Sequence, residues 1–174
     1  MANSIQEAKI TGFAAFIPAA AEGRLEKYQE IYEQNRHRVY SLAFWMTDNE
    51  LAAEELLDST FRRAFAMTEE PDEDMIDRAL IAEVRELMTI GSLTLECALA
   101  TEVADIRRNT KRVHLERAIV QLPATERLVF LMHDGEGYAH DRIARALGLA
   151  VDESRYALHQ ARLRIRELVS KMVW

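Results

Sequence analysis

The segment "DRIARALGLAVDESRYALHQARLRIREL" (residues 141–168) decides the fold of the C-terminal part of the chain. Its apolar residues recur at helical spacing on both sides of Gly148, a residue type that ends helices readily because it adopts a left-handed turn. Ala144 is small enough for two helices to cross closely, and Ile143 and Leu147 supply apolar side chains between them. The segment therefore predicts a helix-turn-helix, an arrangement by which many proteins read DNA.

Two acidic residues, Asp152 and Glu153, stand where the second helix of this motif begins. The positive end of a helix is a site that ordinarily suits phosphate. Asp152 can cap the helix by accepting from free backbone N–H groups, and Glu153 is favourable at the positive end of the helix dipole. Two interpretations stay open: Glu153 accepts from a cytosine amino group in the major groove, or the helix no longer binds DNA.

The rest of the chain has the composition and the periodicity of a helical protein. Only six Gly and three Pro occur among 174 residues, which argues against an architecture rich in turns. Apolar residues spaced by three, four and seven predict a series of helices. We expect them over residues 24–46, 51–67, 76–90, 95–106, 124–133, 139–147 and 152–172. No segment shows the alternation of a strand, so we predict an all-α protein.

Charge divides the chain into two modules. Residues 1–105 hold 9 Lys and Arg against 21 Asp and Glu, whereas residues 106–174 hold 13 against 8. An acidic half and a basic half suggest different partners, and the basic half suits nucleic acid. The polar stretch "RRNTKR" (107–112) is the expected linker. We predict two small helical domains, 1–106 and 114–174, joined by residues 107–113.

The sequence offers little that points to catalysis, to a cofactor or to a metal. It contains no Gly-rich phosphate loop, and its five histidines are scattered without metal-ligand spacing. We expect no enzymatic activity, no cofactor and no metal site. No apolar run reaches eighteen residues, residues 10–21 are expected to lead into the first helix, and the single Cys97 suits a reducing compartment. We therefore expect a cytoplasmic protein that does not enter a membrane.

A fixed order of residues over 123–148 carries a family resemblance. It comprises a Leu-Pro pair, an Arg four residues after the Pro, a Glu-Gly turn, an Ile-Ala pair and a Leu-Gly pair, here Pro123, Arg127, Glu136, Gly137, Ile143, Ala144, Leu147 and Gly148. This pattern closely resembles the promoter-reading C-terminal domain of bacterial RNA polymerase sigma factors of the extracytoplasmic-function group.

Residues 28–65 resemble the N-terminal domain of the same group. The matching steps are Arg38-Val39-Tyr40, then the run Ala53–Asp58, then Phe61. The resemblance implies that the N-terminal domain binds core RNA polymerase and opens the minus-ten element, and that the C-terminal domain reads the minus-thirty-five element. Core polymerase and promoter DNA are the implied partners, with an anti-sigma factor as a further candidate.

The resemblance also assigns candidate contact residues. For DNA these are Glu153, Arg155, His159 and Arg162, and for polymerase Glu55, Asp58 and Phe61. The chain departs from the family at several of them: Asp58 stands for a Gln, Glu153 for a Thr and Ser154 for a packing Val. The expected strand-opening segment, residues 68–77, holds six acids and no base, which disfavours contact with phosphates.

Two functions follow from these observations. The first is a sigma factor that binds core polymerase and directs promoter-specific initiation. The alternative is a diverged sigma-like module that has lost promoter opening and regulates through a protein partner. An exposed face carrying Arg155, His159, Arg162 and residues 107–112 favours the first function. If the acidic half covers that face, the second function or a packed-off resting state is favoured.

Overall fold

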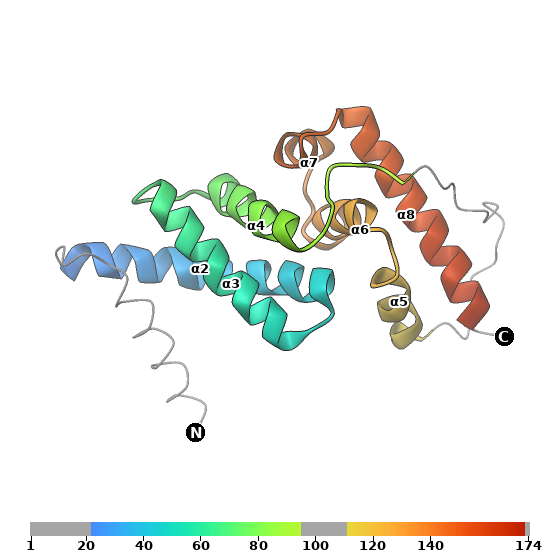
Figure 1. Cartoon of the computed structure of the whole chain (residues 1–174), viewed down its shortest axis with the longest axis horizontal. Helices are drawn as coiled ribbons and strands as arrows, with labels where there is room; N and C mark the ends of the chain where they lie inside the picture. Colours follow the sequence, from blue (N-terminus) through green and yellow to red (C-terminus); the bar gives the residue numbers. More distant parts are fainter. Residues whose placement is uncertain (1–21, 95–110, 173–174) are drawn as a thin grey trace, which may run out of the picture.

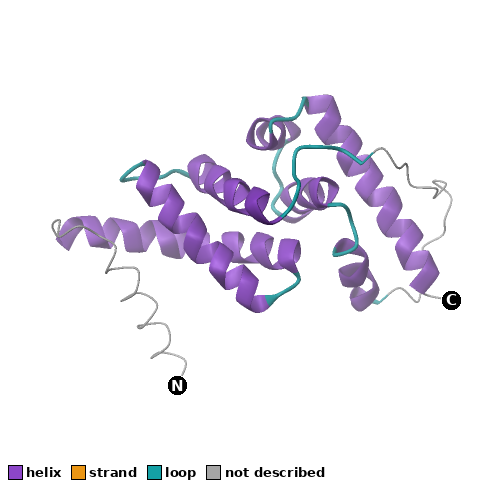
Figure 2. Cartoon of the chain, viewed as in Figure 1, coloured by secondary structure: helices purple, strands orange, loops and turns teal. Residues whose placement is uncertain are grey.

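The computed structural model describes residues 22–94 and 111–172, and within these two ranges every regular element is a helix (Figure 2). This confirms the all-α prediction. The elements are α2 (Glu22–Thr47), α3 (Glu50–Met67), α4 (Glu73–Leu87), α5 (Arg112–Ile119), α6 (Ala124–Phe130), the π-helical turn η1 (Leu131–Gly135), α7 (His140–Leu147) and α8 (Val151–Met172).

Helices α2, α3 and α4 form the N-terminal unit, in which α3 packs against both of the others (Figure 1). The predicted turn at residues 47–50 is confirmed, with Asp48 in a left-handed conformation at φ 52°. The side chain of Asn49 then caps α3 by accepting from the backbone N–H of Ala52 at 2.9 Å. Aromatic packing joins α2 to α3, where the rings of Tyr28 and Phe65 meet edge to face at 4.5 Å.

Helix α4 begins three residues earlier than the periodicity of its apolar residues predicts. The side chain of Asp72 accepts from the backbone N–H of Met75 at 2.8 Å and so caps the helix. Glu73 and Asp74 then occupy the first turn, where negative charge is favourable. Capping and the helix dipole thus outweigh the lack of apolar residues there. The helix predicted over 95–106 and the leader over 10–21 lie outside the described residues.

Helix α8 is the long element of the C-terminal unit and packs against α5, α6 and α7 (Figure 1). The helix predicted over 124–133 is α6 continued by the π-helical turn η1, in which the N–H of Glu136 donates to the carbonyl of Leu131 at 3.0 Å. Such wide turns often occur beside functional residues. Gly137 follows in a left-handed conformation at φ 73°, which turns the chain toward α7.

The two units touch each other through four helices and η1. Helix α4 contacts α7, and α2 contacts α6 and η1. A single cluster of buried apolar side chains runs from Val39 in α2 to Val169 in α8. In the part of the chain that the structure describes, no helix has the length and apolarity needed to cross a bilayer.

Candidate nucleic-acid and polymerase interfaces

The predicted helix-turn-helix is confirmed as α7, a tight turn and α8. Gly148 ends α7 in the left-handed conformation at φ 72°, and the N–H of Leu149 donates to the carbonyl of Ala144 at 2.9 Å. Ile143 and Leu147 are buried between the helices, as the spacing indicates. Residues 151–153, at the start of α8, are exposed, and α8 is in the sequence position of a recognition helix.

The two acids at the start of α8 serve different purposes. The carboxylate of Glu153, three residues after Ala150, accepts from the backbone N–H of Ala150 at 2.7 Å. This is the back-reaching half of a capping box. Asp152 instead pairs with Arg155 at 2.9 Å. The expectation that Asp152 caps this helix is wrong, because the residue three positions into the helix is the one that reaches back to the unpaired N–H.

Arg155, His159 and Arg162 lie on one exposed face of α8, spaced by four and three residues. The side chains of Arg155 and Arg162 are 63% and 48% exposed. The opposite face carries the buried residues that pack on α5, α6 and α7, and among residues 22–94 the acidic N-terminal unit leaves the basic face open. Of the expected basic linker, residues 107–110 lie outside the described ranges.

Arg162 is held by a carboxylate that the sequence did not single out. Asp134, in the π-helical turn η1, accepts two hydrogen bonds from the Arg162 guanidinium at 2.7 and 3.0 Å. The hydrogen bond from Arg162 lowers the pKa of the Asp134 carboxyl, and burial opposes that shift. The two residues are 28 positions apart, so no local pattern reveals the pair. A phosphate must therefore compete with this carboxylate for Arg162.

A second unpredicted pair explains one departure from the family. Ser154 is fully buried, and its hydroxyl lies 3.0 Å from Nδ1 of His140 in α7. The His140 ring in turn stacks on His133, with centroids 4.6 Å apart. The hydroxyl that stands for a packing Val thus has a polar partner across the turn of the motif.

Of the three candidate polymerase residues, two lie on the surface and one lies in the core. Glu55 and Asp58 are exposed on α3, and the exposed Leu51 extends the same stripe toward the start of the helix. Phe61 is fully buried, and its ring packs against Tyr32 with centroids 4.8 Å apart. Phe61 is therefore a core residue, and its expected contact with a partner is corrected. Phe61 shares the buried face of α3 with Leu57 and Ala64, which lie four residues before it and three residues after it.

Half of the acids in the segment 68–77 face the C-terminal unit. The guanidinium of Arg142, on α7, lies 2.9 Å from Asp74, 3.1 Å from Glu73 and 2.9 Å from Asp77. The Asp77 side chain is only 4% exposed. Sequence reasoning treated these acids as repelling DNA, and it missed their partner because Arg142 lies about 65 positions further along the chain.

Asp77 and Tyr138 extend this cluster to α2. Arg38 donates to Asp77 and, at 2.5 Å, to the hydroxyl oxygen of Tyr138. The Arg142 guanidinium lies over the Tyr138 ring, 3.8 Å from its centroid. Burial raises the pKa of the Tyr138 hydroxyl, as does the nearby Asp77 carboxylate, so the phenol stays protonated. We call Arg38, Glu73, Asp74, Asp77, Tyr138 and Arg142 the interdomain cluster.

Arg127, part of the family motif, joins three helix ends through backbone carbonyls. Its guanidinium donates to Met46 at 3.0 Å at the end of α2, to Leu122 at 2.8 Å, and to Val120 after α5. Burial lowers the pKa of Arg127, yet an arginine remains charged at any ordinary pH. This residue therefore has an architectural role in the chain.

The segment after α4 is fastened to the start of α6. The N–H of Gly91 donates to the Thr125 hydroxyl at 3.2 Å, and that hydroxyl donates to the carbonyl of Ser92 at 2.8 Å. The N–H of Thr94 donates to the carboxylate of Glu126 at 2.9 Å. We call these three hydrogen bonds the clasp. Thr125 and Glu126 are both buried, so the α6 side of each bond is shielded from water.

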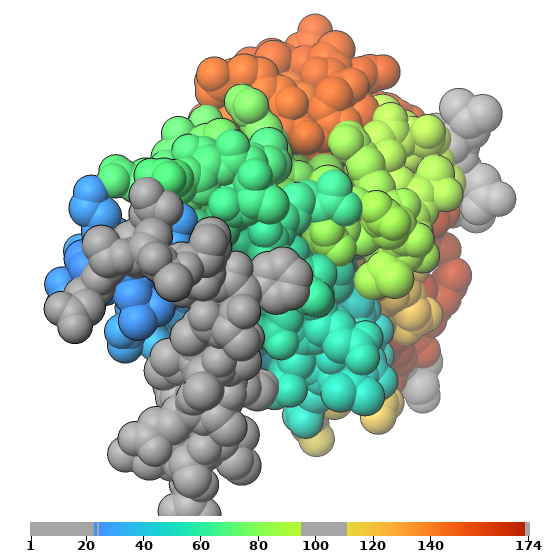
Figure 3. All heavy atoms as spheres, turned by 60° about the vertical axis from the view of Figure 1, so that its left-hand side comes forward, coloured from blue at the N-terminus to red at the C-terminus, as the bar shows by residue number. Residues whose placement is uncertain are grey.

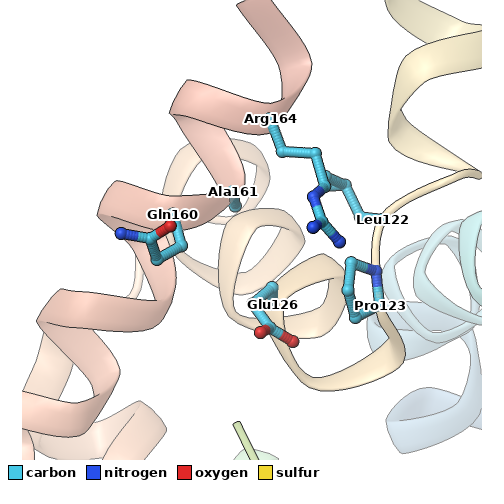
Figure 4. A pocket seen from close by; sticks show the side chains of 6 residues that line it. All are labelled: Leu122, Pro123, Glu126, Gln160, Ala161 and Arg164. Carbon is cyan, nitrogen blue, oxygen red and sulfur yellow. The ribbon is translucent and has the colours of Figure 1, made fainter. Parts of the chain in front are cut away.

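The other carboxylate oxygen of Glu126 borders a small pocket between α6 and α8 (Figure 4). Gln160, Ala161 and Arg164 of α8 also line it, and the Arg164 guanidinium points toward the Glu126 side of the space. The enclosed volume is about 10 Å³, which is room for about one water molecule. Within the described residues no three His, Cys, Asp or Glu side chains gather as metal ligands. The candidate functional features of the described residues are thus the exposed face of α8 and the exposed stripe of α3.

Comparison with known proteins agrees with this geometry. Residues 112–165 match the family model described as sigma-70, region 4. The chain is similar to the ECF RNA polymerase sigma factor SigE of Mycolicibacterium smegmatis, 24% identical over 177 aligned positions that cover 92% of this chain and 68% of that protein.

A solved structure shares the fold over most of the chain. It is the co-crystal structure of the sigma factor RpoE in complex with the anti-sigma factor NepR from Bartonella quintana. The TM-score is 0.62 at 16% identity, covering 82% of this chain and 96% of that chain. The helix-turn-helix domain is thus similar to region 4 of the sigma-70 family. The similarity to an extracytoplasmic-function sigma factor extends beyond this domain into the N-terminal unit.

Proposed function

We propose that the protein binds core RNA polymerase and directs transcription initiation from specific promoters. The observation that carries the proposal is the open basic face of α8, with Arg155, His159 and Arg162 exposed on a helix-turn-helix of the region 4 type. The proposal implies a cytoplasmic protein without an enzymatic activity of its own.

The domain roles follow the same proposal. Residues 1–106 dock on polymerase and contact the minus-ten element, residues 107–113 link the domains, and residues 114–174 read the minus-thirty-five element. On α3, Glu55 and Asp58 offer carboxylates to polymerase beside the exposed Leu51. On α8, Arg155, His159 and Arg162 contact DNA.

Glu153 has a narrower role in DNA reading than its sequence position suggests. Its carboxylate already accepts from the N–H of Ala150. A carboxylate has several lone-pair sites, so a second hydrogen bond from a cytosine amino group stays compatible with the cap. Glu153 is thus a specificity candidate whose first role is to begin the helix.

An anti-sigma factor is the third proposed partner. The solved RpoE structure of the same fold contains the anti-sigma factor NepR. A protein of this class that covers α3 or the face of α8 competes directly with polymerase or with promoter DNA.

Run-off transcription tests the proposed function. Sigma-free core polymerase and the purified chain are supplied with fragments of the host genome, and discrete transcripts are expected. The double variant Arg155→Ala with Arg162→Ala should lose these transcripts, because both arginines lie on the DNA face. Lys171→Ala serves as a matched control, since it removes one exposed cation near the far end of the same helix.

Equal transcription by the double variant and the control contradicts the role of the α8 face. An absence of transcripts from the unmodified chain, although polymerase is bound, points to the alternative function, a sigma-like module that regulates through a protein partner.

A further inference from the structure

We propose that the acidic start of α4 is a docking surface for the protein's own helix-turn-helix domain, and that this docking competes with DNA for Arg142. The closed arrangement is then a resting state that opens before a promoter is bound. The inference rests on the proposed function for its biological meaning, but its physical content concerns the free protein alone.

The contact is an ion-pair network with a buried centre. Arg142 is only 25% exposed, and Glu73, Asp74 and Asp77 surround its guanidinium on one side of α4. Figure 3 shows α7 in orange lying directly on α4 in green. Three carboxylates around one guanidinium reproduce the charge environment that phosphates supply, because an oxygen-rich anionic surface suits the planar donors of arginine.

Further contacts support the same closed arrangement. Arg85, near the end of α4, donates to the carbonyl of Leu147 at the end of α7 at 2.8 Å. Gly91 approaches the same carbonyl, because a Cβ at that position would lie 3.4 Å from the Leu147 oxygen. Together with the clasp, these bonds fasten the segment after α4 along the C-terminal unit.

Promoter geometry requires that these contacts separate. Elements centred about 25 base pairs apart lie roughly 85 Å apart along B-DNA, at about 3.4 Å per base pair. A compact chain of this length has a radius of gyration of only about 16 Å, so docked domains cannot reach both elements. The chain between the end of α4 and the start of α5 spans residues 88–111. Fully extended, it reaches about 80 Å.

The position of Arg142 explains why the acids compete with DNA. It lies on α7, the first helix of the motif, and in helix-turn-helix complexes that helix crosses the DNA backbone. The carboxylates of α4 therefore occupy a guanidinium that faces phosphate in an open complex. Three acids of residues 68–77 thus hold the docked helix-turn-helix domain. They lie at the place where the family has strand-opening residues.

The distance between the two domains in the free protein tests the docking directly. Spin labels are attached at Met67→Cys on α3 and Lys171→Cys on α8, in a Cys97→Ser background, since both side chains are exposed. We expect one narrow distance distribution. Arg142→Glu should broaden it and shift it to longer distances, because four carboxylates then face each other.

Two further variants separate docking from general damage. Arg145→Glu makes the same charge change on the same helix, where the arginine is exposed and pairs only weakly with Asp141 at 3.6 Å, and it should leave the distribution narrow. Adding Asp74→Arg to Arg142→Glu should restore the narrow distribution. If Arg142→Glu does not fold, Arg142→Gln replaces it. An unchanged distribution in the folded Arg142 variant overturns the docking.

Competition with DNA has its own readout. The variant Glu73→Gln with Asp74→Asn opens the contact without altering the helix-turn-helix domain. Its affinity for a 30-base-pair duplex is measured by fluorescence anisotropy at low salt. The affinity should rise about tenfold if the fraction of molecules in the open, DNA-binding form rises from about one in ten to nearly all. An unchanged affinity overturns the competition. Neither measurement needs polymerase, so failure here is distinguishable from failure of the proposed function.

Discussion

At the scale of single residues, Arg155 and Arg162 on the proposed DNA face of α8 are each paired with a carboxylate. Asp152 pairs with Arg155, and Asp134 binds Arg162 through two hydrogen bonds. A phosphate that approaches this face must displace a carboxylate at each arginine. Non-specific binding to the DNA backbone is thereby weakened, whereas contacts that also read a base edge retain their advantage.

Replacing Asp134 by Asn should strengthen non-specific DNA binding. The change frees the Arg162 guanidinium from its carboxylate, so one more cation is available to phosphate. We expect higher affinity at low salt and a slope of log K against log salt that is steeper by about 0.9. The measurement is a salt titration by fluorescence anisotropy on a duplex of unrelated sequence.

Asp141→Asn is the matched control for this change, because Asp141 pairs weakly with an arginine on α7. Its salt slope should equal that of the unmodified protein. A slope for Asp134→Asn equal to that of the control would mean that Arg162 does not contact phosphate.

The acids at the start of α8 show what a single sequence reveals at this scale. Their stabilising effect on the helix follows from position alone, since negative charge is favourable there. Which of them caps was not predictable, because a side chain three residues into a helix reaches the unpaired N–H only in the folded geometry. Phe61 was named a polymerase contact from family likeness, whereas its helical spacing placed it inward, and the structure has it in the core.

At the scale of elements, the helix-turn-helix is fastened by a polar contact across its turn. His140 of α7 and the buried Ser154 of α8 lie within hydrogen-bond distance at 3.0 Å. Burial lowers the pKa of the His140 imidazole. The positive charges of His133, Arg155 and Arg162 act in the same direction, and Asp134 opposes them. The neutral ring is therefore the form that the folded protein favours.

Stability should consequently fall as the solution becomes acidic. A histidine whose pKa is lower in the folded state than its ordinary 6.5 binds protons more readily when unfolded. Its contribution to the free energy of unfolding is complete above pH 6.5 and is lost as pH falls below that value. Urea unfolding at pH 7.5 and at pH 5.5 measures this difference.

His140→Gln should reduce that pH dependence, whereas the exposed His37→Gln on α2 should preserve it. An equal pH dependence in His140→Gln and in the unmodified protein would show that another group is responsible.

Helix positions were largely predictable because buried apolar residues recur with the helical period. The starts of α3, α7 and α8 lie within about two residues of the predicted ones, the usual precision of helix ends. The π-helical turn η1 was not predictable. A π-helical turn holds one more residue than an α-helical turn. In the sequence, this extra residue only weakens the helical spacing of the apolar residues.

At the scale of the whole molecule, the acidic half and the basic half of the chain contact each other through ion pairs. Acids of α4 meet Arg142 of the basic half, and Asp77 also binds Arg38 within the N-terminal unit. The sequence indicated two modules with unlike charge, but not that they dock. Docking depends on which acid meets which arginine across about 65 residues of chain, and a single sequence contains no record of that pairing.

Arg127 connects the two units through backbone carbonyls. Replacing it by Lys keeps the charge but cannot reach the carbonyls of Met46, Val120 and Leu122 together, because an ammonium lacks the planar fork of the guanidinium. We expect a loss of about 2–3 kcal/mol in the free energy of unfolding, from partly buried carbonyls left unpaired. Urea unfolding measures this loss.

Arg117→Lys serves as the control, because Arg117 is an exposed arginine of α5. It should change the free energy of unfolding by less than about 0.5 kcal/mol. If the two variants are equally stable, water replaces the hydrogen bonds of Arg127 and its architectural role is wrong.

Binding to sigma-free core RNA polymerase tests the central claim most directly. The purified chain and its Glu73→Gln, Asp74→Asn variant are each mixed with core polymerase and co-eluted from a sizing column at moderate salt. The account predicts a stoichiometric complex, formed more completely by the variant and weakened by Asp58→Lys on the exposed stripe of α3. If neither folded protein forms a complex at micromolar concentration, with no inhibitory partner present, the claim that this chain is a working sigma factor is contradicted.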